Sequence, residues 1–61
     1  MNIRMILHVS DGDFLLFEGS PEDCPPVPRC GDEIVHQQYQ VRLEGVTHRY
    51  LADELEISLL A

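Results

Sequence analysis

The stretch from Tyr39 to Tyr50 constrains the fold more than any other part of the chain. Apolar and polar residues alternate along it, which is the pattern of a strand with one buried face. The apolar positions shift by one residue at Glu44-Gly45. A β-bulge at Gly45 would produce this shift, because a bulge adds one residue and bends the strand. We therefore expect one long, bent strand, as a small and strongly curved sheet requires.

Alternation elsewhere, together with one short apolar run at residues 14–17, predicts four further strands. They cover residues 3–9, 14–17, 34–36 and 54–59. The first two should form a hairpin, because Asp11-Gly12 supplies the positive φ angles of a tight turn. The last segment, residues 51–60, leaves a choice, since Leu51, Leu55 and Leu59 also lie at helical spacing. A strand is preferred there because it completes the ladder of a small sheet.

The expected fold class is all-β in a single domain, residues 1–61. A chain of this size buries only about 60% of its unfolded surface. Five strands favour a small SH3-like open barrel or a strongly twisted antiparallel sheet, with an α+β fold carrying a C-terminal helix as the alternative. Residues 19–30 hold all four prolines, which predicts a stiff, extended loop. We expect this loop to be dispensable for folding.

The charge balance narrows the choice of partner. Eleven acidic residues against four arginines and no lysine give a formal net charge of −7. Binding to nucleic acid through phosphates needs a basic face, so neither direct nucleic-acid binding nor attraction to an anionic membrane is expected. A solvated surface, a basic protein partner and mimicry of a polyanion all remain open. No segment resembles a targeting signal or a membrane span, so we expect a cytoplasmic protein.

Apolar residues on both faces of one strand bear on the oligomeric state. Residues 14–17 are all apolar, and Ile6 can lie beside them on the outer side of the first strand. A strand that is apolar on both faces is usually covered on both sides. The second cover can come from another subunit, so we expect a homo-oligomer.

Cys24 and Cys30 enclose five residues, three of them proline. This spacing does not match the Cys-x-x-Cys motif of redox enzymes. Free, structural cysteines are preferred, with a disulfide as one alternative and a zinc site that recruits His36 together with His8 or His48 as the other. A cytoplasmic location keeps the thiols reduced.

No motif of a catalytic or cofactor site is present in the chain. His48 shares the period of Val46 and Tyr50, so it is expected to be a core-edge residue that points the same way. Asp11-Gly12-Asp13 is interpreted as a turn, because the further oxygen ligands of a calcium loop are missing. We therefore predict no enzymatic activity, no catalytic residue, no cofactor and no metal.

Three segments carry a resemblance to known proteins. They are Pro28-Arg29-Cys30-Gly31-Asp32-Glu33-Ile34, Tyr39-Gln40-Val41 and Val46-Thr47-His48-Arg49-Tyr50. This order resembles a pattern of short, uncharacterised phage and bacterial proteins, in which Pro-x-x-Gly-Asp-x-Ile precedes a Tyr-x-Val strand and an aromatic or His-rich return strand. Gly-Asp-x-Ile is also similar to the start of a strand in SH3-like barrels. The resemblance covers about half of the chain and implies a small β-barrel fold and a phage or bacterial source. It carries over no catalytic residue.

The function predicted from the sequence is a non-enzymatic binding module. The proline-rich loop and the sheet edges are the expected contact surfaces, with Val27 and Arg29 on the loop. Arg42 and Arg49 are expected to engage an anion on a sheet face. The expected partner is a protein, and the acidity leaves a basic one open. The alternative is a phage-encoded inhibitor of a bacterial defence system, acting as an acidic polyanion mimic or by sequestering a nucleotide signal.

Overall fold

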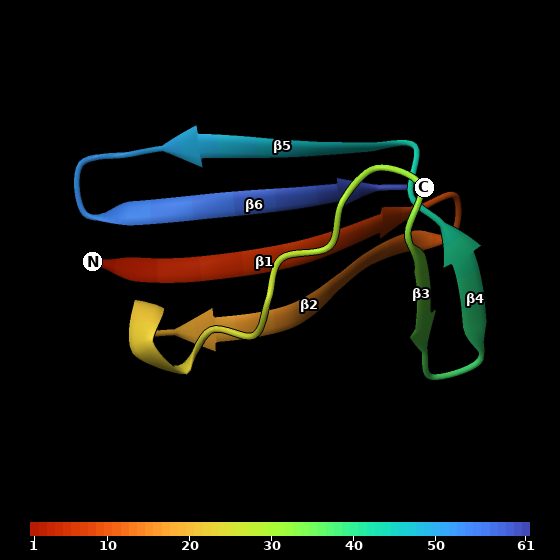
Figure 1. Ribbon diagram of the computed structural model, residues 1–61, viewed down its shortest axis with the longest axis horizontal. Helices are drawn as coiled ribbons and strands as arrows, with labels where there is room; N and C mark the ends of the chain where they lie inside the picture. Colours follow the sequence, from red (N-terminus) through yellow and green to blue (C-terminus); the bar gives the residue numbers. More distant parts are fainter.

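The computed structural model describes residues 1–61 and contains six strands and one short 3₁₀ helix (Figure 1). The elements are β1 (Asn2–Val9), β2 (Gly12–Gly19), η1 (Pro21–Asp23), β3 (Glu33–His36), β4 (Tyr39–Arg42), β5 (Gly45–Tyr50) and β6 (Glu54–Leu60). The predicted all-β class is confirmed, and the last segment is a strand. None of the structure's helices has the length and apolar character that crossing a membrane would need.

The main sheet has four strands in the order β2-β1-β6-β5, while β3 and β4 form a separate hairpin. The sheet is mixed, because β1 and β6 run parallel in its centre and β2 and β5 flank them antiparallel. It is therefore not purely antiparallel. It is also not closed into a barrel, because the edge strands β2 and β5 do not pair with each other. Register explains the central pair: Ile3, Met5 and Leu7 lie opposite Leu55, Ile57 and Leu59, so both central strands present their apolar residues to one face.

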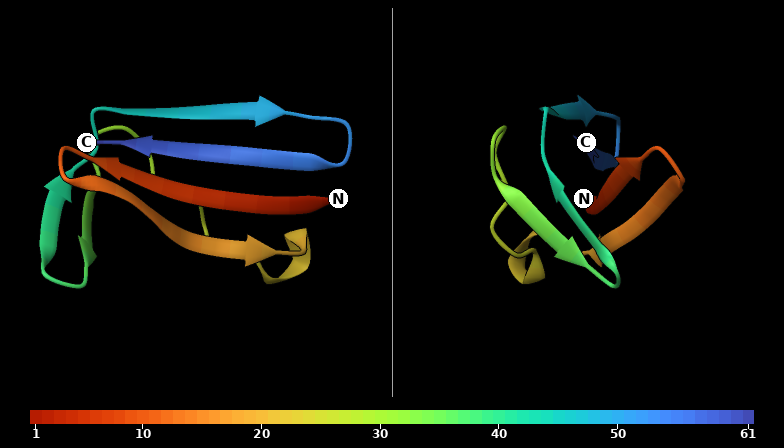
Figure 2. Two further views of the ribbon diagram at one scale, coloured as in Figure 1. Left: turned by 180° about the vertical axis from the view of Figure 1, so that it is seen from behind. Right: turned by 90° about the vertical axis from the view of Figure 1, so that its right-hand side faces the viewer.

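This face, which we call the inner face, holds the core. All six buried residues are apolar, namely Ile3, Met5, Leu7, Leu43, Ile57 and Leu59. The β3–β4 hairpin and the proline-rich loop both lie on this side of the sheet (Figure 2). At the hairpin, the Phe14 ring of β2 packs against the rings of His36 and Tyr39, with centroids 5.6 and 5.0 Å away. The opposite, outer face is not covered by any element.

The predicted single strand over residues 39–50 is wrong, because β4 and β5 belong to different sheets. Between them, Leu43 is buried and its N–H donates to Asp32 O at 2.8 Å, while Glu44 N–H donates to Leu60 O at 2.7 Å. The shift in the alternation therefore marks a corner at which the chain leaves the hairpin and joins the main sheet. A register shift of the kind predicted at Gly45 occurs instead between β1 and β2, where Leu16 has no partner in the ladder.

The proline-rich loop is a part of the core's cover. It starts beside the end of β2 and crosses in front of β1 and β6 towards the start of β5 (Figure 1). Cys24 and Val27 pack against the buried cluster. Removing residues 20–29 would uncover apolar surface, so the expectation that the loop is dispensable for folding does not fit this packing.

The outer face carries the apolar residues on which the expected homo-oligomer depends. Ile6 and Leu15 are neighbours there in the β1–β2 register, and Leu15 is 50% exposed. That a second copy of the chain covers these two residues stays a prediction.

Candidate binding groove

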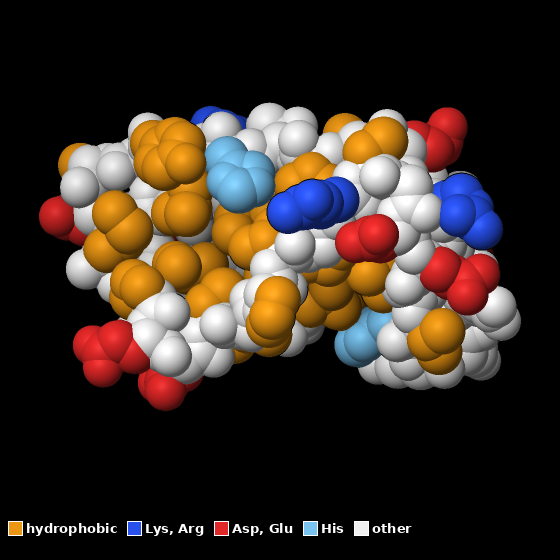
Figure 3. Space-filling view, in the orientation of Figure 1, with side chains coloured by type: hydrophobic (Ala, Val, Ile, Leu, Met, Phe, Trp, Pro, Cys, Tyr) orange, Lys and Arg blue, Asp and Glu red, His pale blue; other side chains and the backbone are white.

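The single pocket of the molecule is an open groove of about 370 Å³ between the proline-rich loop and β5. Its lining residues are Val27, Pro28, Arg29, Cys30, Val46 and His48. Figure 3 shows a histidine and an arginine side by side over hydrophobic side chains on this face. The groove therefore combines an apolar floor with two nitrogen-bearing side chains.

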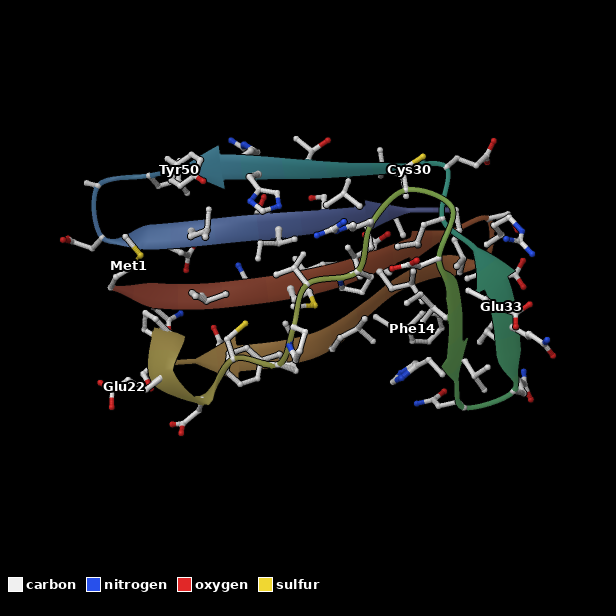
Figure 4. All side chains as sticks on the ribbon, in the orientation of Figure 1. Met1, Phe14, Glu22, Cys30, Glu33 and Tyr50 are labelled. Atoms are coloured by element: carbon white, nitrogen blue, oxygen red, sulfur yellow. The ribbon has the colours of Figure 1, made fainter.

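β5 supplies one wall of the groove through the residues that share the inner face. Val46, His48 and Tyr50 lie opposite Leu59, Ile57 and Leu55 of β6. The prediction that His48 points the same way as Val46 and Tyr50 is thereby confirmed. However, His48 is exposed, with its ring centroid 6.4 Å from that of Tyr50 at the end of the strand (Figure 4).

The loop supplies the other wall through a tight turn from Arg29 to Asp32. Asp32 N–H donates to Arg29 O at 3.0 Å, and Arg29 N–H donates to Asp32 Oδ2 at 2.8 Å. Gly31, the third residue of the turn, has a φ of +96°. A type II turn requires such a positive φ at its third residue, which is why glycine stands there.

The turn is fastened to the corner between β4 and β5. Gly31 N–H donates to Leu43 O at 2.8 Å, and the Arg42 guanidinium donates to Gly31 O at 2.8 Å. The Cys30 thiol donates to Glu44 O at 3.2 Å (Figure 4). Because Leu43 belongs to the core, these bonds hold the Arg29 backbone on a fixed support. The groove wall is thus preorganised.

The structure separates the four residues that the sequence predicts as contacts. Val27 and Arg29 line the groove, whereas Arg42 and Arg49 do not. Arg42 instead holds the Arg29–Asp32 turn through its bond to Gly31 O. Arg49 lies on the outer face and donates to Glu56 Oε1 at 3.1 Å. A binding role for any of them stays a prediction.

Sequence reasoning missed His48 and Val46 as groove residues. Their shared period with Tyr50 places them on one face of β5, and this signal was present in the sequence. What the sequence does not reveal is that the loop runs past this face. Pro28 and Cys30 were missed for the same reason, because a groove is made by two segments far apart in the chain.

Arg29 is the only one of the four arginines whose guanidinium makes neither a hydrogen bond nor an ion pair. Arg4 and Arg49 pair with glutamates, and Arg42 bonds a main-chain oxygen. The groove lining contains no acidic residue. Cys24 and Cys30 are free thiols, and no group of three or more His, Cys, Asp or Glu side chains lies close enough to hold a metal ion. The groups present are suited to binding an anion.

β5 is also a free edge of the main sheet, because it is last in the strand order. Leu51 N–H donates to Glu54 O at 2.8 Å at the start of the β5–β6 ladder. Residues that bond to the neighbouring strand alternate in an antiparallel pair. Thr47 and Arg49 are in step with Leu51 and bond to β6, so Val46, His48 and Tyr50 direct their N–H and C=O groups away from the sheet.

Comparison with known proteins adds no functional information. No family model, curated protein or solved structure matches this chain. The groove and the free edge beside it are the features of the molecule that bear on its function.

Proposed function

We propose that this protein is a non-enzymatic binding module that captures an extended segment of a protein partner along the free edge of β5. One observation carries the proposal: the groove and the unpaired backbone groups belong to the same strand, at Val46 and His48. In recognition by strand addition, main-chain hydrogen bonds supply affinity, and pockets for alternate side chains supply specificity. β5 offers both within six residues.

The hydrogen bonds that hold the proline-rich loop in place support this function. Binding costs free energy when loops must be ordered, so a wall that is already fixed loses less on association. The bonds from the Arg29–Asp32 turn to Leu43 and Glu44 provide that fixation, and the prolines of residues 19–30 restrict the chain before it.

The acidity of the chain favours a partner whose surface around the captured segment is basic. A formal charge of −7 attracts basic surfaces at long range and raises the rate of encounter, while short-range contacts determine what stays bound. The proposal needs no nucleic-acid or membrane contact.

The test is selection from a displayed library of random twelve-residue peptides on the immobilised protein. We expect enrichment of peptides that alternate in polarity. Hydrogen exchange measured by NMR should show new protection at the amides of Val46, His48 and Tyr50 when an enriched peptide is added. The absence of any enriched peptide, or protection confined to β2, would contradict the proposal.

A second candidate is the inhibitor of a bacterial defence system that mimics a polyanion. It is favoured by the acidic side chains without an arginine partner, since only Glu18 and Glu56 form ion pairs with arginine and Asp13 bonds the His8 imidazole. Binding of this kind to a nucleic-acid-binding protein should weaken steeply between low and moderate salt. A partner affinity that is insensitive to salt would exclude this candidate. Sequestration of a nucleotide signal between subunits also requires a dimer, which sedimentation can detect.

A further inference from the structure

We infer that the groove selects a carboxylate: the captured segment carries an acidic side chain that pairs with the guanidinium of Arg29. This inference rests on the proposed function and adds the chemistry of the bound segment. It follows from the charge of the groove, from the support under Arg29 and from the geometry of a strand added to β5.

The groove is a local exception on an acidic molecule. No acidic residue occurs in residues 24–31 or 45–52, the two segments that meet at the groove. The acidic residue nearest to Arg29 along the chain, Asp32, uses Oδ2 to accept the main-chain N–H of Arg29, and the guanidinium itself makes no ion pair. An anion is therefore repelled by most of this surface and attracted here.

A carboxylate fits the donors that the groove offers. The planar guanidinium presents paired N–H groups that match the two oxygens of a carboxylate. His48 lies in the same lining and can donate a further hydrogen bond. Arg29 and His48 are exposed in the free protein. A segment that packs on Val27, Pro28 and Val46 would cover these donors, and the exclusion of water would then strengthen the ion pair.

Strand addition brings a side chain to this position. A strand paired to β5 lies about 4.8 Å beyond it, and its side chains alternate between the two faces. Those opposite Val46 and His48 project onto the inner face, on the side where Arg29 lies. The bound segment should therefore have an acidic residue at one inner-facing position and an apolar residue two positions away, where Tyr50 and the groove floor supply apolar contacts.

The experiment repeats the peptide selection with two charge-reversal variants. Arg29→Glu changes the groove, and Arg49→Glu is the matched control on the outer face of the same region. The native protein should enrich peptides with Asp or Glu at one fixed position, and R29E should enrich Lys or Arg there. R49E should keep the acidic preference.

Synthetic peptides then measure the size of the effect. With a C-terminally amidated peptide from the native selection, we expect that replacing its acidic residue by the corresponding amide weakens binding by about ten- to a hundred-fold. The same replacement should have an effect of no more than about two-fold with R29E, because the guanidinium is gone.

The outcomes separate this inference from the proposed function. If the native protein enriches strand-forming peptides without an acidic position, or if R29E keeps the acidic preference, the carboxylate inference is wrong and the binding module stands. If the acidic group turns out to be the peptide's own C-terminus, amidation abolishes binding and the side-chain inference is overturned. If the native protein enriches nothing, the proposed function itself fails.

Discussion

Arg49 on β5 and Glu56 on β6 form an ion pair on the outer face, with Nη1 3.1 Å from Oε1. The pair is one end of a row that crosses the sheet. Arg4 on β1 lies between Glu56 and Glu18 of β2, with Nη1 3.9 Å from Glu56 Oε2 and Nε 3.4 Å from Glu18 Oε2. Each strand thus contributes one charge, and the signs alternate. The outer face is balanced at this row, and the excess negative charge lies elsewhere.

Glu56 should contribute more to stability than Arg49. The Glu56 side chain is 18% exposed and serves two arginines, whereas that of Arg49 is 61% exposed and has one partner. We expect Glu56→Gln to lower the free energy of unfolding by about 1 kcal/mol and Arg49→Gln by about 0.3 kcal/mol, because solvent screens exposed pairs. Urea denaturation measures both, and the difference should shrink in high salt. Equal effects would mean that the row adds nothing beyond separate surface pairs.

Gly31 should be a glycine that the fold requires. Its φ of +96° is unfavourable for any side chain, although the space around it is open. We expect Gly31→Ala to cost about 1–2 kcal/mol of stability. Gly45→Ala should change stability by less than about 0.5 kcal/mol, because Gly45 has no positive φ and a Cβ there would meet Leu60 at an ordinary 3.7 Å. Thermal unfolding of the two variants tests this order, and the reverse order would contradict the turn geometry.

Leu43 should be essential although it lies outside every strand. It is 2% exposed at the corner between β4 and β5. Truncation of a buried leucine to alanine costs about 2–5 kcal/mol, and a domain of this size has only about 3–5 kcal/mol in total. We therefore expect Leu43→Ala to be largely unfolded by circular dichroism at 25 °C. Val35→Ala is the control, since Val35 is 71% exposed and should behave like the native chain.

These residues show what could be predicted from the sequence. Alternation identified the strands that contain Ile3 and Leu55, because burial on one face leaves a local pattern, and an apolar run identified the strand that contains Phe14. Alternation joined β4 and β5 wrongly, since a pattern of period two reports which side chains are buried but not which sheet buries them. The shift of the apolar positions by one residue after Leu43 did mark a break in the strand. Its cause is a corner between two sheets.

Two of the four predicted contact residues lie in the groove, and two do not. The prolines identified a stiff loop, and so pointed to Val27 and Arg29 in the groove wall. The partners of Arg42 and Arg49 lie 11 and 7 residues away in the chain, and no local pattern reveals that these side chains are already engaged. His48 was placed on the correct face, but its exposure depends on the path of the loop.

Whether a bound peptide pairs with the free edge of β5 can be tested by removing one N–H group that points away from the sheet. A proline at an edge strand is tolerated where its missing N–H faces solvent, and it disrupts the ladder where the N–H is bonded. His48→Pro should therefore stay folded, whereas Thr47→Pro should lose about 1–3 kcal/mol through its missing ladder hydrogen bond, since Thr47 bonds to β6. His48→Pro should lose affinity for the enriched peptides by about ten-fold or more, the cost of one backbone hydrogen bond and of the clash with the added strand.

His48→Ala is the matched control, because it removes the imidazole and keeps the N–H. Fluorescence polarisation should show that it binds the same peptides within about five-fold of the native protein, because it loses at most one side-chain hydrogen bond. If His48→Pro binds as well as His48→Ala, the peptide does not pair with this edge. If Thr47→Pro is the more stable proline variant, the direction of the backbone groups along β5 is reversed, and Thr47 and Arg49 face the free edge in place of Val46 and His48.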